Sequence, residues 1–494
     1  MEECFHIFVV IMLLLLLLHI PATCSAAQGI DTDLYALLEL KDSVEFDPQH
    51  VLDKNWTTTS SSSSSSVCSW VGVTCSESTP QRVEALEIPN MRLQGTIPPK
   101  LGDLSSLTRL DISNNTFKGP LPDEMANLRR LKLINFEHNQ FSGEIPEWLV
   151  ELPEVQYLNL GRNNFAGFPA SPSFSPNLEY LNVSFNQING DIPQEIGNLS
   201  KLKSLDMQSN QLTGNIRTMY GIPSLEHIDF SYNSLSDMLP EDLCRSLPNL
   251  KFLRLSWNHL VGKFPSSLAE CSKLQNLSLS FNSFESEIPA GFGNLTMLQE
   301  LALGGNMLTG RIPDELGNLI YLEVLALENN NLNGSIPSFI SNLSSLKVLN
   351  LHSNKLSGGL PKEIGNWSTS ITQIDLSDNH LLGKIPDEIG ALSSLEILAI
   401  NFNYLSGKIP TSIFNMSTLE MLSLVENNLT GNLPPNLPCN LETLYLGGNR
   451  LSGSIPGLYS NNFTGPIPDS LGNLRALVLD QAENSTSQNL KHIR

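Results

Sequence analysis

The sequence predicts a right-handed α/β solenoid with a concave parallel β-sheet and a helical cap at its N-terminal end. The main support is a motif, L-x-x-L-x-L-x-x-N-x-L-x-G-x-I-P, that returns with a nearly constant period through most of the chain. One asparagine marks each copy: Asn115, Asn139, Asn163, Asn186, Asn210, Asn233, Asn258, Asn282, Asn306, Asn330, Asn354, Asn379, Asn403, Asn427 and Asn449. Because each coil of a solenoid contacts only its neighbours, 494 residues need not imply several domains.

One copy of the motif shows why these residues form a coil. Leu110 and Ile112 alternate with polar residues, which is the period of a strand with one buried face. Asn115 turns inward, where its amide is expected to pair with backbone groups of the turn and of the neighbouring coil. Gly119 permits a positive-φ bend and Pro122 starts an extended stretch. Self-similarity of this kind is typical of a leucine-rich repeat.

Residues 1–27 are expected to be a secretory signal peptide. Residues 5–20 are almost wholly apolar, and small residues follow up to Ala27. The start carries Glu2 and Glu3 and no basic residue, so an uncleaved anchor helix is the alternative, although the run is short for a membrane span. No later run is long and apolar enough to be a span.

Residues 28–80 are expected to form a cap over the first coil. Residues 31–44 have helical spacing of apolar residues, with Asp31 or Thr32 as the capping residue. Residues 57–66 contain seven consecutive serines and are expected to be a loop.

The G-x-I-P consensus resembles the plant-specific class of leucine-rich repeat. Stretches such as LQGTIPPKLGDLSSLTRLDISNN and NNFTGPIPDSLGNLR are similar to the ectodomains of plant leucine-rich repeat receptor-like kinases, over about residues 30–479. The resemblance implies a surface that binds an extracellular peptide or protein ligand, with an LRR co-receptor and a role in signalling or defence. It also implies a Cys68–Cys75 disulfide that closes the end of the coil.

No catalytic constellation accompanies the repeats. The chain has no glycine-rich phosphate loop, no H-R-D and no D-F-G, so no kinase and no other enzyme is expected, and it resembles an ectodomain cut short before the membrane span. The alternatives are a secreted protein similar to polygalacturonase inhibitors and a non-functional receptor fragment.

Two cysteines occupy nearly the same place in adjacent repeats, since Cys244 follows Asn233 at almost the same distance as Cys271 follows Asn258. They therefore fall on the convex side one coil apart, within reach of a disulfide, with two buried thiols as the alternative. Cys439 has no evident partner. No paired Cys or His spacing indicates a metal, and no cofactor is expected.

Glycosylation sites and the signal peptide together support a secreted, apoplastic glycoprotein, or a protein of the cell-surface plasma membrane if the chain is a fragment of a full receptor. Thirteen N-x-S/T sites begin at Asn55, Asn114, Asn182, Asn198, Asn276, Asn294, Asn333, Asn342, Asn366, Asn415, Asn428, Asn462 and Asn484. The net charge of −21 argues against nucleic acid and anionic lipid as partners. It fits either simple solubility or attraction for a basic peptide.

A ligand surface is predicted on the exposed side of the concave strands. One lane of residues, directly before the asparagines, contains Phe185, Ser209, Tyr232, Trp257 and Phe281, and another, five residues earlier, contains Tyr180, Ser204, His227 and Phe252. Asp206, Asp229 and Arg254 lie between them. Exposed aromatic residues near an arginine are typical of binding hot spots. The alternative is that the rings only stiffen the sheet through cross-strand pairs.

The regular solenoid is expected to cover residues 81–457 and to degenerate in residues 458–494. After Asn449 the next asparagine of the ladder is Asn461, which follows at only half the usual spacing, as if the middle of a repeat were missing. We expect the chain beyond about Gly457 to fray.

Overall fold

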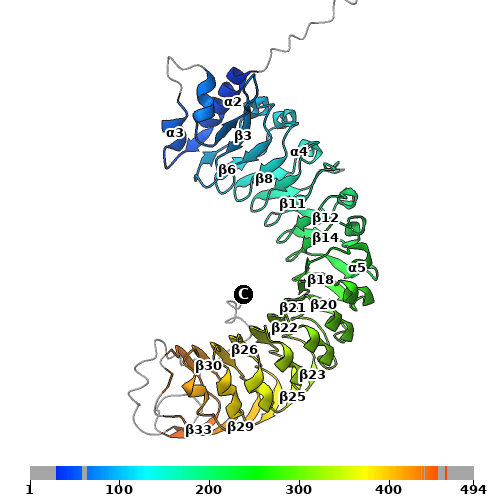
Figure 1. Ribbon diagram of the computed structural model, residues 1–494, viewed down its shortest axis with the longest axis vertical. Helices are drawn as coiled ribbons and strands as arrows, with labels where there is room; N and C mark the ends of the chain where they lie inside the picture. The colour runs from blue at the N-terminus through cyan, green and yellow to red at the C-terminus, as the bar shows by residue number, and fades with distance from the viewer. Residues whose placement is uncertain are drawn as a thin grey trace, which may run out of the picture.

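The protein is a curved solenoid with one repeat per coil (Figure 1). The structure, a computed structural model, describes residues 29–57, 64–170, 172–434, 437–438, 440–453 and 462–463. The predicted signal peptide and Cys439 lie outside these residues. The coils follow one another along an arc from the N-terminal cap, and the helical turns lie on its outer side. The predicted leucine-rich repeat solenoid is confirmed.

A long sheet of short strands follows the concave side. Its members in the described residues, in order of pairing, are β2 (Val73–Cys75), β3 (Val83–Glu87), β5 (Arg109–Asp111), β7 (Leu133–Asn135), β9 (Tyr157–Asn159), β11 (Tyr180–Asn182), β13 (Ser204–Asp206), β15 (His227–Asp229), β17 (Phe252–Arg254), β19 (Asn276–Ser278), β21 (Glu300–Ala302), β22 (Val324–Ala326), β24 (Val348–Asn350), β26 (Gln373–Asp375), β28 (Ile397–Ala399), β30 (Met421–Ser423) and β32 (Thr443–Tyr445). All pairs are parallel except β2 with β3. In each three-residue strand of this sheet from β5 to β32 the central leucine or isoleucine is buried in the core.

The asparagine ladder binds each coil to the one before it. The Asn115 Nδ2 atom donates to the carbonyl oxygens of Ile112 in its own turn and of Ile88 in the preceding coil, both at 2.9 Å. Its Oδ1 atom accepts from the Leu93 amide at 2.9 Å. The same pattern recurs at Asn306 and Asn449. Each asparagine therefore satisfies buried backbone groups that the strands leave unpaired.

A second set of short strands follows the asparagine turns and forms four separate sheets in the described residues. It consists of β1 (Val44–Phe46), β4 (Gln94–Gly95), β6 (Thr116–Gly119), β8 (Gln140–Glu144), β10 (Asn164–Gly167), β12 (Asn189–Asp191), β14 (Gln211–Thr213), β16 (Ser236–Met238), β18 (His259–Gly262), β20 (Ser283–Phe284), β23 (Asn333–Gly334), β25 (Lys355–Gly358), β27 (His380–Gly383), β29 (Tyr404–Lys408), β31 (Asn428–Asn432), β33 (Arg450–Gly453) and β34 (Asn462–Phe463). Gly119 ends its strand at φ +86°, as its place in the motif predicts.

Short helical turns form the convex side. They are η2 (Pro99–Asp103), η3 (Asp123–Asn127), α4 (Glu147–Glu151), η4 (Gln194–Asn198), η5 (Arg217–Gly221), α5 (Leu243–Ser246), η6 (Ser266–Glu270), η7 (Ala290–Asn294), η8 (Asp314–Asn318), η9 (Ser338–Asn342), η10 (Lys362–Asn366), η11 (Asp387–Ala391) and η12 (Ile413–Asn415). Cys244 in α5 and Cys271 after η6 form a disulfide with their Cα atoms 5.2 Å apart. The expected bridge is confirmed.

The N-terminal cap consists of α2 (Ile30–Asp42), α3 (Val51–Asn55) and η1 (Ser64–Ser69), closed by the Cys68–Cys75 disulfide. The predicted capping of the first helix was wrong. The helix begins one residue earlier, Gly29 occupies the N-cap, and no side chain bonds to it.

Asp33, which the pattern did not single out, holds the cap to the first coil. Its carboxylate is fully buried and accepts from the Arg82 Nε and Nη2 atoms at 2.8 and 2.7 Å and from the Val83 amide at 2.8 Å. The pairing was invisible in the sequence because Asp33 and Arg82 stand 49 positions apart.

The C-terminal irregularity is partly described. β34 pairs with β33 in the usual register, but Ser452 faces Asn462 only 10 positions on, whereas in an ordinary coil Ser406 faces Asn428, 22 positions on. The shortened repeat thus adds a paired strand, β34, beyond Gly457, where the sequence predicts fraying. The predicted fraying concerns residues that lie mostly outside those described.

Candidate ligand-binding surface

The first aromatic lane lies at the first residue of each concave strand. Parallel pairing places Tyr157, Tyr180, Ser204, His227 and Phe252 in a row across five coils. The rings of Tyr157 and Tyr180 stack with centroids 4.3 Å apart, and those of His227 and Phe252 with centroids 5.2 Å apart. Tyr157 was missed because the lane was traced only from Tyr180, although it stands at the same place in the preceding repeat.

The second aromatic lane lies directly before the ladder asparagines. Tyr232, Trp257 and Phe281 form a continuous stack with centroid separations of 5.5 and 3.9 Å. Phe185 lies two coils before Tyr232, under the guanidinium of Arg162 at 4.1 Å. Tyr232 remains 52 % exposed and Trp257 44 %. The rings therefore stack across the coils and still present apolar surface to solvent, and their role in ligand binding stays a prediction.

The residues of the second lane have left-handed backbone, which sequence reasoning missed. Tyr232, Trp257 and Phe281 have φ values of 57°, 59° and 55°. Bulky residues adopt this region rarely, so the turn after the strand must impose it. A signal was present, since other coils have Gly305 and Gly448 at the same place.

Between the two lanes lie the charged residues. The Arg254 Nε atom donates to Asn276 Oδ1 at 3.2 Å, and its Nη1 atom lies 3.9 Å from Asp229 Oδ2. The expected exposure of Asp229 was wrong, since it is 4 % exposed and its Oδ1 atom accepts from the Ser231 amide. Asp229 thus stabilises the turn and orients Arg254, which stays accessible.

Asp206 occupies the equivalent place in the coil of β13. Its Oδ1 atom accepts from the Gln208 amide at 3.1 Å, and its Oδ2 atom accepts from Gln208 Nε2 at 3.2 Å. Burial raises the pKa of Asp206 to about 6, with a smaller contribution from the negative charge of Asp229. Burial also lowers the pKa of His227, which favours its neutral form.

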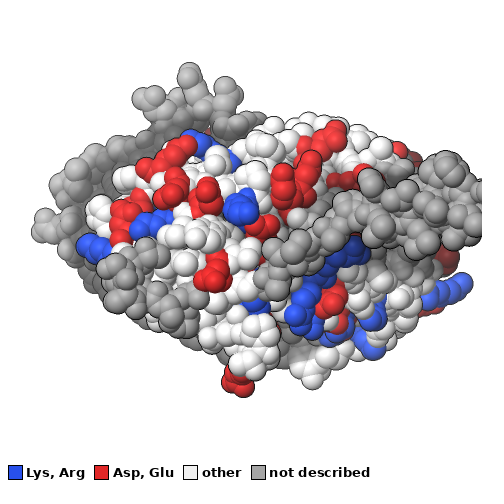
Figure 2. Space-filling view, turned by 90° about the horizontal axis from the view of Figure 1, so that it is seen from above, with Lys and Arg blue, Asp and Glu red and all other residues white. Residues whose placement is uncertain are grey.

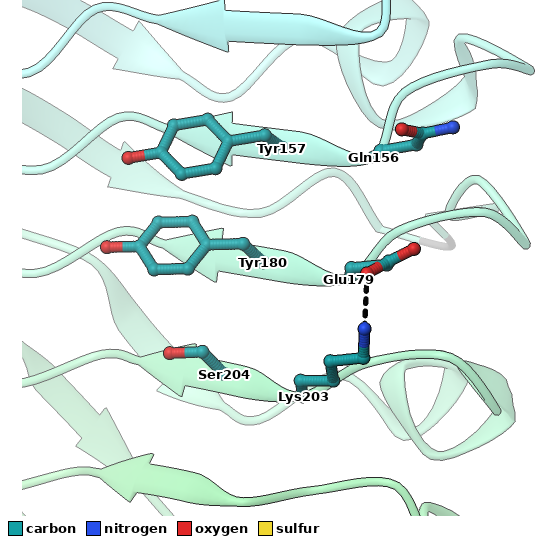
Figure 3. Close-up of a pocket in the computed structure, with 6 residues that line it drawn as sticks. All are labelled: Gln156, Tyr157, Glu179, Tyr180, Lys203 and Ser204. Atoms are coloured by element: carbon teal, nitrogen blue, oxygen red, sulfur yellow. Dashed lines mark hydrogen bonds and ion pairs between the residues drawn. The ribbon is translucent and has the colours of Figure 1, made fainter.

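A shallow hollow opens at the N-terminal part of the first lane (Figure 3). It is lined by Gln156, Tyr157, Glu179, Tyr180, Lys203 and Ser204. The two tyrosine rings lie parallel and point the same way, and the ladder of rings stops at Ser204. Lys203 reaches back to Glu179, where Nζ and Oε2 are 2.7 Å apart, so its charge is already paired.

The predicted glycosylation sites differ in accessibility. Exposed residues are Asn114, Asn198, Asn294, Asn333, Asn342, Asn366, Asn415 and Asn428, whereas Asn55 is half-buried, and Asn462 and Asn484 lie where no side chain is described. Asn182 and Asn276 are buried on the concave face. An N-glycan is attached to Nδ2, which in Asn182 lies 3.5 Å from Tyr180 Oη and in Asn276 donates to Glu300, so a glycan at either position would replace a contact on the concave face.

Outside the two aromatic lanes, the features to consider are the distribution of charge, groups that could hold a metal, apolar helices and the disulfides. Acidic and basic side chains are interspersed over the face seen from the N-terminal end (Figure 2). In the described part of the chain, no group of His, Cys, Asp and Glu side chains has the arrangement of a metal site. Within the same residues no helix has the length and apolarity that crossing a membrane requires. The two disulfides are typical of extracellular proteins.

Comparison with known proteins agrees with this architecture. The leucine rich repeat N-terminal domain matches residues 30–76, and leucine rich repeat families match residues 105–165, 153–212, 224–246, 249–271, 273–295, 297–319, 321–343, 345–367, 370–392 and 440–460. The chain belongs to the leucine-rich repeat family. The N-terminal match ends close to the predicted cap boundary at residue 80.

Relatives of this leucine-rich repeat chain include plant receptor kinases. It is 35 % identical over 97 residues to the LRR receptor-like serine/threonine-protein kinase EFR of Arabidopsis thaliana, over 20 % of this chain and 9 % of the kinase. It is 36 % identical over 84 residues to a probable inactive leucine-rich repeat receptor-like protein kinase of the same plant, over 17 % of this chain and 11 % of that protein. The matches thus span about a tenth of these relatives.

Solved receptor ectodomains share the fold. A crystal structure of PEPR1-AtPEP1 has a TM-score of 0.77 and 34 % identity, and covers 91 % of this chain and 65 % of that chain. A TDR receptor has a TM-score of 0.71 and 29 % identity, and covers 78 % of this chain and 69 % of that chain. The Arabidopsis receptor kinase HAESA, in complex with the peptide hormone IDA and the co-receptor SERK1, has a TM-score of 0.61 and 25 % identity. The match covers 90 % of this chain and 92 % of that chain.

Proposed function

We propose that this leucine-rich repeat chain is an extracellular recognition module, that its concave face between β9 and β19 binds a peptide, and that a co-receptor joins the complex. The observation that carries the proposal is the stack of exposed Tyr232 and Trp257 on half-buried Phe281, in the coils next to Arg254. Aromatic side chains and arginine supply most of the free energy at protein interfaces. The similar ectodomains bound to AtPEP1, and to IDA with SERK1, support a peptide as the ligand class.

The proposal assigns no catalytic role to the chain. A secreted glycoprotein of the apoplast fits the disulfides and the exposed N-x-S/T sites, and a signalling or defence role follows by analogy with the receptors. No structural observation favours an inhibitor of polygalacturonase over this function.

The test measures binding of the AtPEP1 and IDA peptides to the secreted, glycosylated protein. Trp257→Ala and Arg254→Ala should each weaken binding by roughly thirtyfold, equivalent to about 2 kcal/mol, if these residues are hot spots. Phe402→Ala is the matched control, because Phe402 has the same place in its repeat, the same left-handed backbone and the same 44 % exposure as Trp257, but lies six coils further on.

Equal loss of affinity in the Phe402 and Trp257 variants would place binding elsewhere. Failure of both peptides to bind at the concave face would sink the proposed function for this peptide class. Because Trp257 stacks on two rings, its removal should also cost about 1–3 kcal/mol of local stability. Each variant is therefore compared after a thermal melt has confirmed that it is folded.

A further inference from the structure

The first aromatic lane is interrupted at one coil. Tyr180 is covered on one side by Tyr157, and His227 is covered on one side by Phe252. The coil between them has Ser204, whose side chain is too short to cover either ring. The opposite faces of Tyr180 and His227 are therefore both turned towards the space above Ser204. Figure 3 shows one side of this space, where the ring of Tyr180 is followed by the short side chain of Ser204.

The second lane is interrupted at the same coil. Arg162 covers Phe185 from the preceding coil, and Trp257 covers Tyr232 from the following one. Ser209 lies between Phe185 and Tyr232, with the same left-handed backbone as both of them. The two lanes thus have serines in one coil, and together these leave a transverse gap, which we call the serine notch.

The width of the notch fits one planar group. Neighbouring strands lie about 4.8 Å apart, so the rings on either side of the notch are separated by about 9.6 Å. A flat group midway would lie about 4.8 Å from each ring, within the range of about 4.5–7 Å that stacked rings adopt. The protein uses such a contact itself, where the guanidinium of Arg162 lies over Phe185.

The floor of the notch is acidic. Asp206 lies on β13 between Ser204 and Ser209, two residues after the first and three before the second. Asp229 stands beside it in register, and Arg254 is one strand further, next to Asp229. In the described residues no salt bridge involves Asp206, whereas Lys203 in the same coil is paired with Glu179. Burial raises the pKa of Asp206, and the charge of Arg254, one strand beyond Asp229, offsets only a small part of this rise.

We propose that the serine notch binds the guanidinium group of an arginine side chain of the peptide ligand, stacked between the rings and paired with Asp206. The inference rests on the proposed peptide-binding function and specifies one residue of the ligand. A planar cation satisfies both features at once, because its faces stack on aromatic rings and its edge donates to a carboxylate. A neutral ring would add no cation to the carboxylate, which otherwise accepts, among the described residues, only from the Gln208 amide and Nε2, and an ammonium group would stack poorly.

The test titrates the full secreted protein with the probe acetyl-Gly-Arg-Gly-amide and with its citrulline, lysine and tyrosine counterparts, followed by NMR. The arginine peptide should bind saturably and at least about tenfold more tightly than the other three. Asp206→Asn should weaken its binding by at least about tenfold. Asp111→Asn is the control, because Asp111 also ends a concave strand and accepts from the amide two residues on, but lies four coils away.

A second variant fills the serine notch with aromatic side chains instead of removing the charge of Asp206. Ser204→Tyr with Ser209→Phe completes both lanes with residues that the neighbouring coils already accommodate at these places. It should abolish arginine binding without lowering the melting temperature, since stacked cross-strand rings stabilise a sheet. Asp206→Asn keeps the inference testable if the filled variant does not fold.

Equal binding of the citrulline, lysine or tyrosine peptide would overturn the guanidinium assignment. So would equal effects of Asp206→Asn and Asp111→Asn, which would indicate only general attraction to an acidic protein. These outcomes are independent of the peptide test above, which depends on Trp257. Arginine binding to the notch, with no effect of Trp257→Ala on AtPEP1 or IDA binding, would reject the proposed ligand surface and leave the notch as a separate site.

Discussion

At the scale of single residues, burial decides what the polar groups of the concave face do. Asp229 and Asp206 occupy the same place in consecutive coils, and each accepts from the amide two residues further on. Asp229 has Arg254 within 3.9 Å, whereas burial without so close a cation raises the pKa of Asp206 to about 6. One aspartate therefore orients a cation of the protein, and the other is available to a cation of a ligand.

The raised pKa of Asp206 has a consequence for stability. Its ordinary pKa is 3.8, so between pH 4 and 6 the folded protein binds a proton that the unfolded chain does not. Stability therefore falls as the pH rises through this range, and the loss persists above pH 6. Asp206→Asn should stabilise the surrounding coils at pH 7.5 by at most about 3 kcal/mol and change little at pH 4. Melting curves at both pH values check this, and a variant less stable than the native protein at pH 7.5 would contradict it.

At the scale of elements, the repeating motif predicted the strands and turns of each coil, but it did not predict contacts between segments that are far apart in the sequence. The strands and the bend at Gly119 are set within one repeat, and the asparagine bonds recur between every pair of neighbouring coils, so all three could be inferred from the repeating motif. The lanes of aromatic residues were visible for the same reason. The left-handed backbone of Trp257, the inward turn of Asp229 and the Asp33–Arg82 pair depend on packing between coils, which one repeat does not display.

The Asp33–Arg82 pair gives a prediction for the cap. Asp33→Ala removes the acceptor of two guanidinium bonds and of the Val83 amide in a buried place. The loss should cost about 3–5 kcal/mol, because one partner of a buried charge pair is deleted. Hydrogen exchange should then become faster in α2, β2 and β3 and stay slow in β24. Unchanged protection in the cap would show that the Cys68–Cys75 disulfide and the core suffice without this pair.

At the scale of the whole molecule, a solenoid allows coils that do not bind the ligand to be destabilised without affecting the coils that do. Each concave strand pairs only with its two neighbours, so a local lesion should stay local. The coils with the aromatic stack also have the Cys244–Cys271 disulfide on their convex side, so they are fastened on both faces. This arrangement adds a covalent link on the convex side of two coils whose concave side presents the stacked rings of Tyr232 and Trp257.

Replacing one equivalent core leucine by alanine in each of two coils tests whether destabilisation stays within a coil. Leu255 and Leu351 are both fully buried and both stand three residues before a ladder asparagine, so replacing either by alanine should cost about 2–5 kcal/mol in its own coil. Leu255→Ala should weaken binding of AtPEP1 or IDA, whichever the native protein binds, because Leu255 supports the turn that holds Trp257, whereas Leu351→Ala should leave the affinity unchanged. Hydrogen exchange of each variant should accelerate only in the mutated coil and its neighbours. Acceleration along the entire arc would mean that the coils unfold as one unit, and the aromatic surface would then depend on every coil.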